Sequence, residues 1–411
     1  MMEICRELIS YSNPVTNQPV KHHILYSKGT KRCLLSQVNI YLHDTARHSE
    51  NTSLRYSGVL SRFFRFLISE NQISSDEMHD FYLQADNDSL KAWQVQQIIN
   101  RNELGKSRPS EKSVYDSAVL VTDFYYWLEQ NDYPSSINVH TKKWVAKFKE
   151  NDLLAYIAKG SKRVKDSKQI KVFKSRTQIY KPDDLLTIEQ IKTALESYSD
   201  PVYPALYKLC MGTGLRPSGA VQFPYKGFGP NSHISPWENM REEYANKAFF
   251  KYYVKEKGKA RKVKINTNCF ETIYIAYKPL LYKRRALYKL KHGKEAPLSA
   301  FWFDKKGKIV TEKMISDASY YVSKKLDFDF KFYNSRHWFA TMFILEHLKN
   351  TKGNISYNAA VEQALIDQLG HGKIGTTYEF YIKKAMLYAH VIDNPGMSDL
   401  ITDKGFLSLL D

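Results

Sequence analysis

A strongly basic stretch, residues 159–181, divides the 411-residue chain. It carries nine Lys and Arg side chains against a single acid, Asp166, and has few apolar residues. A stretch of this kind contributes little to a hydrophobic core, and burial of apolar surface is what stabilises a folded domain. We therefore predict a linker between two separate domains. Its one-sided charge also suits a strap that follows phosphates, because each Lys or Arg on a phosphate releases counterions.

The composition is that of a globular protein with a polyanionic partner. Hydrophobic residues make up 43% and charged residues 25% of the chain, which are ordinary globular values. The net charge of +18 points first to nucleic acid and second to an anionic membrane. The sequence shows no apolar run near the ~18 residues of a membrane span and no signal-peptide pattern. We expect a cytoplasmic protein without a membrane partner. The four cysteines form no CxxC pair, so we predict reduced thiols.

The part of the chain before the basic stretch changes from weakly periodic to helical. Residues 1–30 are weakly periodic and are predicted to be a loop or extended arm, with the adjacent His22 and His23 on the surface. Apolar spacing of the helical kind follows, and we predict a small all-α domain over 33–157. Its helices are expected from about Ser36 and at about 52–68, 89–103 and 110–130.

Basic side chains lie opposite the apolar stripe of the helix at about 52–68, which we expect to be capped by Thr52. They are Arg55, Arg62 and Arg65. A solvated helix face explains any one of them. Together with the net charge, Arg55 and Arg62 are candidate DNA contacts.

The second domain should begin at residue 183 and mix helices with a hairpin. A capping box at Thr187 opens one helix, and a second helix over about 201–212 should stop before Pro217. Alternating strands flank a Lys257-Gly258 turn, which predicts a β-hairpin. We expect a long loop over 225–245 and a short strand over 300–303.

Four polar residues of this second domain stand in unusual settings. Arg216 should lie on the turn before a proline, Lys257 at the hairpin tip, Arg336 at the start of an aromatic helix, and His371 in a Gly-His turn before an aromatic run. Each has an ordinary structural explanation, as a helix cap, a surface lysine, an ion-pair partner or a turn residue.

Taken together and in this order, these residues resemble the tyrosine recombinases, or phage-type integrases. The resemblance covers roughly residues 183–385. It rests on Thr213-Gly-Leu-Arg-Pro-Ser218 as the first arginine box, Lys257-Gly258 with Lys259 and Arg261 as the lysine hairpin, Ser335-Arg-His-Trp-Phe-Ala-Thr341 as the second arginine box, and Leu369-Gly-His371 as the third.

The chain also departs from the family pattern. Gly219 stands where the family usually has a Glu that supports the first arginine, and Tyr333 stands where it usually has His. Tyr333 can donate a hydrogen bond as His would, but it is a weaker base near neutral pH. The nucleophilic Tyr usually follows the third box's His by nine residues, a position that is Phe380 here. We take Tyr381 as the nucleophile, with Tyr378 as the alternative.

The resemblance implies attack of the Tyr381 hydroxyl on a DNA phosphate, giving a 3′-phosphotyrosyl intermediate. Arg216 and Arg336 would hold the nonbridging oxygens, with a fork geometry that one ammonium lacks. Lys257 would protonate the departing 5′-hydroxyl, and His371 would donate to a phosphate oxygen. The chemistry needs no metal and no cofactor. The covalent link preserves the energy of the broken bond, which permits rejoining.

The implied fold is mainly α with a small antiparallel sheet: an all-α core-binding (SAM-like) domain and an α+β catalytic domain that form a C-shaped clamp on DNA. We predict four segments: an N-terminal arm (1–32), the core-binding domain (33–157), a basic linker (158–182), and the catalytic domain with a C-terminal tail (183–411). The candidate DNA-binding residues are Arg55, Arg62, Lys162, Arg163, Lys165, Lys168, Lys259 and Arg261.

The function implied is that of a site-specific DNA recombinase, an integrase of a mobile element. Its partner would be double-stranded DNA, bound by a homotetramer on two sites, with accessory DNA-bending proteins as further partners. Two alternatives stay open: a DNA-binding relative that has lost strand cleavage, and a type IB topoisomerase, which shares the chemistry but acts as a monomer.

Overall fold

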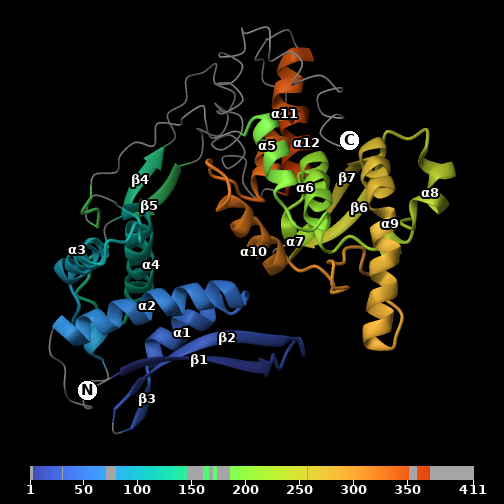
Figure 1. Cartoon of the computed structure of the whole chain (residues 1–411). Coiled ribbons are helices and arrows are strands. Elements are labelled where there is room, and N and C mark those ends of the chain that lie inside the picture. The colour runs from blue at the N-terminus through green and yellow to red at the C-terminus, as the bar shows by residue number, and fades with distance from the viewer. Residues whose placement is uncertain are drawn as a thin grey trace. The chain divides into compact units, whose positions relative to one another are not determined.

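The structure is a computed structural model, and it describes most of the chain (Figure 1). The described residues are 3–29, 31–70, 80–139, 141–145, 161–165, 170–173, 186–256, 258–350 and 359–370. Helices dominate them, with three small antiparallel sheets, so the predicted fold class is confirmed. The chain forms two compact units, Met1–Gln178 and Ile179–Asp411. Their boundary falls inside the predicted linker, while the exact bounds of the four predicted segments stay predictions.

The first unit combines a sheet, four helices and a short hairpin. Its elements are β1 (Glu3–Ser12), β2 (Pro19–Lys28), β3 (Arg32–Leu34), α1 (Ser36–Ala46), α2 (Glu50–Glu70), the 3-10 helix η1 (Phe81–Gln84), α3 (Asn87–Glu103), α4 (Glu111–Gln130), β4 (Thr141–Val145) and β5 (Ser161–Lys165). The predicted helices of this region are confirmed, but α2 begins at Glu50, so Thr52 is not its cap.

The segment predicted as a loop or extended arm, residues 1–30, instead contributes two long strands to a packed sheet. β1 and β2 pair antiparallel over their full length, and β3 adds to β2. β2 packs on both α1 and α2, and β1 packs on α2 (Figure 1). Ile4 and Leu25 are fully buried in the same core as these helices. Side chains of a half-buried strand alternate between a buried and an exposed face. This period of two residues differs from the helical spacing on which the prediction for this region was based. His22 and His23 are buried as well, with 3% and 8% exposure, and not on the surface.

The region 33–157 is not purely helical either. β4 pairs antiparallel with β5, with Thr141 opposite Lys165 and Val145 opposite Ser161. This hairpin crosses the expected boundary between the helical domain and the linker. Part of the basic stretch is therefore a strand, because main-chain pairing with β4 does not depend on apolar side chains.

The second unit is built around a buried helix and a two-stranded hairpin. Its elements are α5 (Ile188–Glu196), α6 (Val202–Thr213), α7 (Pro217–Ala220), η4 (Gly229–Asn231), α8 (Trp237–Tyr244), β6 (Phe249–Glu256), β7 (Lys259–Asn266), α9 (Thr267–His292), α10 (Glu312–Ser323), α11 (Asn334–Asn350) and α12 (Ala359–Leu369). α6 packs against α9, α11 and β7, and α12 packs against β7 (Figure 1).

Several local predictions for this unit are confirmed. The Thr187 hydroxyl accepts from the main-chain N–H of Gln190 at 3.2 Å, and the Gln190 side chain accepts from Thr187 N–H at 2.9 Å, as a capping box requires. The β6–β7 hairpin forms as expected. α6 ends at Gly214, which has φ 67°, and Pro217 opens α7.

Two other local predictions need correction. The region 225–245 is not one long loop, because it contains η4 and α8, the latter preceded by Pro236. The expected strand over 300–303 is reduced to a single bridge between Phe303 and Ile309. Val310 N–H still donates to the carbonyl of Trp302 at 3.0 Å, and Phe301 and Trp302 are buried in the core, so both main-chain bonds and aromatic packing hold this segment. Within the described ranges, no helix is long and apolar enough to cross a membrane.

Candidate active site

Arg216 lies on the turn between α6 and α7, as the sequence predicts, and it is paired with a buried acid. Its Nη1 donates to Oε2 of Glu256 at 2.8 Å, and its main-chain N–H donates to Oε1 at 3.2 Å. The Glu256 side chain is 1% exposed and that of Arg216 is 14% exposed. Because charged hydrogen bonds are strong when shielded from water, this pair fixes the first arginine box on the end of β6.

Arg261 is the second cation on the same carboxylate. Its Nε and Nη2 lie 3.0 and 2.8 Å from Oε2 of Glu256, and its Nη1 donates to the main-chain carbonyl of Gln368. Burial lowers the pKa of Arg261, Glu256 raises it, and the nearby Arg336 and Arg216 lower it further. The candidate DNA contact at Arg261 is therefore, in this structure, a member of the buried charge cluster.

Arg336 connects the second arginine box to the other two. It lies in the first turn of α11 and is fully buried. Its Nη1 donates to the main-chain carbonyl of Gly214, and its Nη2 donates to that of Leu369. The same Leu369 carbonyl accepts from Nη1 of Arg216 at 3.4 Å. Two arginines that are far apart in the sequence thus meet at the end of α12.

Gln368 anchors this end of α12 to the rest of the site. Its Nε2 donates to the carbonyls of Thr213 and Lys264, both at 2.8 Å, and its Oε1 accepts from Lys264 N–H at 3.0 Å. Gly370 follows with φ 62°. A Cβ there would lie 2.5 Å from Cδ of Arg261, so both the backbone and the space favour glycine.

Two residues of the site, Glu256 and Gln368, were not predicted from the sequence. A signal for Glu256 was present: burial alternates along β6, and Phe250, Tyr252 and Val254 face the core. Glu256 continues that register, so a carboxylate falls on an apolar face and needs a cationic partner. No comparable local signal marks Gln368, because its partners come from distant segments.

The charge balance of the cluster favours an anion. Two guanidiniums, from Arg216 and Arg261, contact the carboxylate of Glu256, and the guanidinium of Arg336 lies close enough to lower the pKa of Arg261. Arginine presents its donors in a fixed fork that matches phosphate oxygens, so an excess of arginines in a partly dry site suits a phosphate group.

Tyr333 lies one turn before Arg336 on the same helix end. It is 36% exposed, and its ring packs edge-on against that of His337 with centroids 5.0 Å apart. It is accessible for the hydrogen-bonding role that the sequence suggests. Four other site residues lie outside the described residues: Lys257, His371, Tyr378 and Tyr381.

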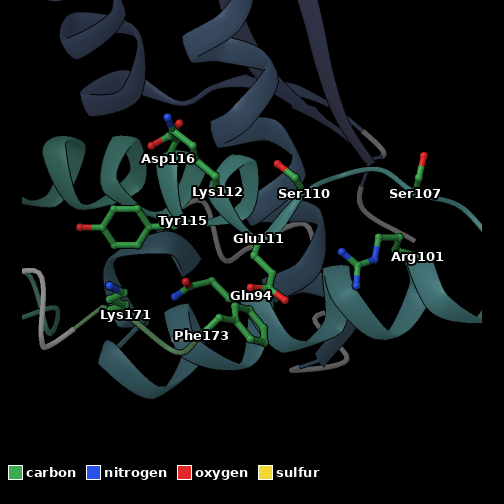
Figure 2. A pocket seen from close by; sticks show the side chains of 10 residues that line it. All are labelled: Gln94, Arg101, Ser107, Ser110, Glu111, Lys112, Tyr115, Asp116, Lys171 and Phe173. Carbon is green, nitrogen blue, oxygen red and sulfur yellow. The ribbon is translucent and has the colours of Figure 1, made fainter. Parts of the chain in front are cut away.

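Two candidate DNA contacts of the first unit, Arg55 and Arg62, line the smaller of two pockets. Arg55 and Arg62 are exposed on α2, and with Arg6 of β1 they line a pocket of about 290 Å³. Asp116 of α4 lines both this pocket and a larger one of about 680 Å³ (Figure 2). The side chains around the larger pocket are Gln94, Arg101, Ser107, Ser110, Glu111, Lys112, Tyr115, Asp116, Lys171 and Phe173.

The remaining candidate DNA contacts are on the hairpins or beyond them. Lys162, Arg163 and Lys165 lie on β5, where the structure gives their main-chain pairing with β4. Lys259 opens β7 and is exposed. Lys168 lies outside the described residues.

The chain is similar in structure to site-specific recombinases. One is XerH site-specific recombinase bound to palindromic difH substrate, with 15% identity, a TM-score of 0.48, and coverage of 88% of this chain and 85% of that one. Another is a lambda integrase dimer bound to a COC′ core site, with 13% identity, a TM-score of 0.47, and coverage of 84% and 94%. No family model and no curated protein matches the sequence.

Proposed function

We propose that this chain is a tyrosine recombinase that cuts and rejoins DNA strands through a 3′-phosphotyrosyl intermediate. The observation that carries the proposal is the meeting of Arg216 and Arg336 at the carbonyl of Leu369. Leu369 stands two residues before His371, so three motifs that are far apart in the sequence converge on one place. A chance occurrence of similar motifs gives no reason for them to converge.

In this proposal Tyr381 attacks a DNA phosphate. The bond from its oxygen to phosphorus forms, the bond from phosphorus to the 5′-oxygen breaks, and Lys257 gives the 5′-oxygen its proton. The tyrosine proton passes to water. Arg216 and Arg336 offset the charge that grows on the nonbridging oxygens, and each such donor contributes on the order of 2.7–4 kcal/mol. Reversal with a different 5′-hydroxyl rejoins the strand.

Contact between Arg336 and a phosphate requires a local rearrangement. Arg336 is fully buried in the structure, and its guanidinium donates to two main-chain carbonyls. DNA binding must therefore move what covers it. A site that reaches its active arrangement only on DNA would also limit cleavage away from the target, since the arginines of unbound protein are shielded.

The test uses nicked duplexes that contain a randomised core, because a short 5′-hydroxyl strand released beside a nick cannot return. A covalent protein–DNA adduct should form with the parent protein and disappear in Tyr381→Phe, while Tyr378→Phe should retain it. Specific binding without any adduct in the parent would instead favour a DNA-binding relative. Relaxation of supercoiled DNA without site dependence would favour a topoisomerase.

The assembly state and partners belong to the same proposal. We expect a homotetramer that joins two target sites, within an integrase of a mobile element. Mass measurement of the complex on DNA with one site and with two sites tests this. We expect two protomers on DNA with one site and four protomers in the complex with two sites. A single protomer per site would contradict the proposed tetramer.

A further inference from the structure

The end of β6 holds a buried carboxylate, Glu256, that the resemblance did not predict. We propose that Glu256 is the positioning residue of the arginine cluster. From its place at the end of β6 it supports Arg216, as a Glu at position 219 would in the family pattern. This inference rests on the proposed function for its catalytic consequence, but its structural content can be tested independently.

Space is the first argument. A Cβ added at Gly219 would lie 3.0 Å from Cδ of Glu256 and inside the contact distance of Oε1. Leu215 Cδ2 lies 3.1 Å away on another side. A side chain at 219 and the carboxylate of Glu256 therefore compete for the same volume. Glycine at position 219 therefore leaves the room that the carboxylate of Glu256 occupies, so the supporting acid is relocated and not lost.

Strand geometry is the second argument. Alternate residues of β6 face the core, namely Phe250, Tyr252, Val254 and Glu256. The Tyr252 hydroxyl donates to the carbonyl of Gly219 at 3.1 Å, which holds α7 against this face of the strand. The register of the hairpin thus places the carboxylate of Glu256 beside the first arginine box, although that box itself contains no acid.

Charge is the third argument. Arg216 and Arg261 both donate to Oε2 of Glu256, each at 2.8 Å from one Nη atom. Without the acid, two guanidiniums would face each other across a site shielded from water, where like charges repel strongly. Oε1 in addition accepts the main-chain N–H of Arg216. One carboxylate therefore fixes both the side chain and the backbone of that arginine.

The position of Glu256 also links the cluster to the predicted general acid. Lys257 is the next residue in the sequence, at the predicted hairpin tip. Glu256 thus positions Arg216 directly and anchors the end of β6, one residue before Lys257 in the sequence.

The experiment moves the carboxylate between the two positions. Glu256→Ala should slow single-turnover adduct formation about 100-fold, as expected for misplaced catalytic groups. Gly219→Glu alone should also lose activity, because two carboxylates would compete for one space. The double variant Gly219→Glu with Glu256→Ala should recover at least about tenfold over either single variant, because it restores one acid beside Arg216.

Two further variants separate positioning from folding. Glu256→Gln preserves the shape of the side chain but not its charge, so it should slow adduct formation while the DNA dissociation constant changes little. Glu271→Gln is the matched control, since Glu271 accepts from Trp237 and lies 3.6 Å from Arg241, both outside the cluster; it should leave the rate unchanged. Parent-like adduct formation by Glu256→Gln would overturn the proposal.

The last measurement does not depend on cleavage. Thermal unfolding of the parent, both single variants and the double variant forms a complete cycle. Gly219→Glu should lower the melting temperature much more in the parent than in the Glu256→Ala background. Additive effects would overturn the claim that the two positions share one space. If the parent forms no adduct, the proposed function fails, and this cycle alone decides whether Glu256 fills the volume beside Gly219.

Discussion

Nη1 of Arg216 lies 2.8 Å from Oε2 of Glu256, a carboxylate that is 1% exposed. The acid and the base come from different elements, 40 residues apart, so the pair depends on the hairpin packing beside the α6–α7 turn. Breaking a buried pair by removing one partner commonly costs about 3–5 kcal/mol, since the other charge is left uncompensated. The candidate site is therefore also a structural junction, and its variants need controls for folding.

Arg336→Lys should lower the rate of adduct formation about 100-fold to 1,000-fold, because one ammonium cannot reproduce two directed donors. Arg285→Lys is the matched control. Arg285 also donates to main-chain carbonyls, those of Ala296 and Ala300 at 2.8 and 2.9 Å, but it lies outside the arginine cluster. It should lower the melting temperature without slowing cleavage. Similar rate losses in both variants would mean that the effect is one of stability.

Lys257→Ala should lose about 100-fold to 10,000-fold in cleavage of ordinary DNA, the usual contribution of a general acid. DNA with sulfur in place of the bridging 5′-oxygen provides the test, because a thiolate leaves without prior protonation. The variant should cleave this substrate at nearly the parent rate. Lys259→Ala, which removes an exposed charge on the same hairpin, should show no selective recovery with sulfur.

Neutralising Lys162, Arg163 and Lys165 together should weaken DNA binding equally for all sequences. The slope of log affinity against log salt should become shallower by about 0.9 for each phosphate that the protein no longer neutralises. The control is a triple variant of Lys305, Lys306 and Lys308, which are exposed lysines on a turn of the second unit. An unchanged slope in the variant of Lys162, Arg163 and Lys165 would mean that these side chains do not neutralise DNA phosphates. Residues 159–181 would then only connect the two domains.

Gly370→Ala should destabilise the protein by more than the roughly 1–2 kcal/mol that a left-handed backbone costs. Its φ is 62°, and the new Cβ would meet the side chain of Arg261. Gly293→Ala is the matched control: Gly293 has φ 64° and nothing within 4 Å of an added Cβ. Chemical denaturation of both variants isolates the steric part. Equal losses would mean that Arg261 moves aside without cost.

The buried histidines of the first unit predict acid sensitivity. Burial lowers the pKa of His22, helped by His43 and Arg47, and burial also lowers the pKa of His23, helped by Arg6. The folded protein therefore binds protons less readily than the unfolded chain, whose His pKa is about 6.5. The contribution of the two neutral histidines to the stability of the folded state is complete above the unfolded pKa. It is lost as the pH falls below about 6.5 toward the lowered folded pKa values.

Unfolding free energies at pH values of about 7.5 and about 5.5, on either side of the unfolded His pKa, measure this effect. The parent should lose stability at the lower pH, and His22→Gln should lose less, because one buried titrating group is gone. His292→Gln changes an exposed histidine and should behave as the parent. An equal fall in parent and His22→Gln would assign the acid sensitivity to other groups.

Much of the local structure followed from the sequence. Apolar spacing predicted α3 and α4, alternation predicted the β6–β7 hairpin, and the Gly-Leu-Arg-Pro pattern placed Arg216 on a turn. Each of these depends on neighbours within about one helical turn or one strand pair. The N-terminal sheet was missed, because its strands are stabilised by packing on distant helices, β2 on α1 and α2 and β1 on α2.

The sequence by itself determined the arginines, the turn that presents Arg216 and the helix start that carries Arg336. Only the tertiary structure decided that Glu256 supports Arg216 in place of a residue at 219, and that both arginines share the carbonyl of Leu369. The physical reason is distance along the chain. Local propensity is set by adjacent residues, whereas the partner of a buried charge is set by whichever segments pack around it.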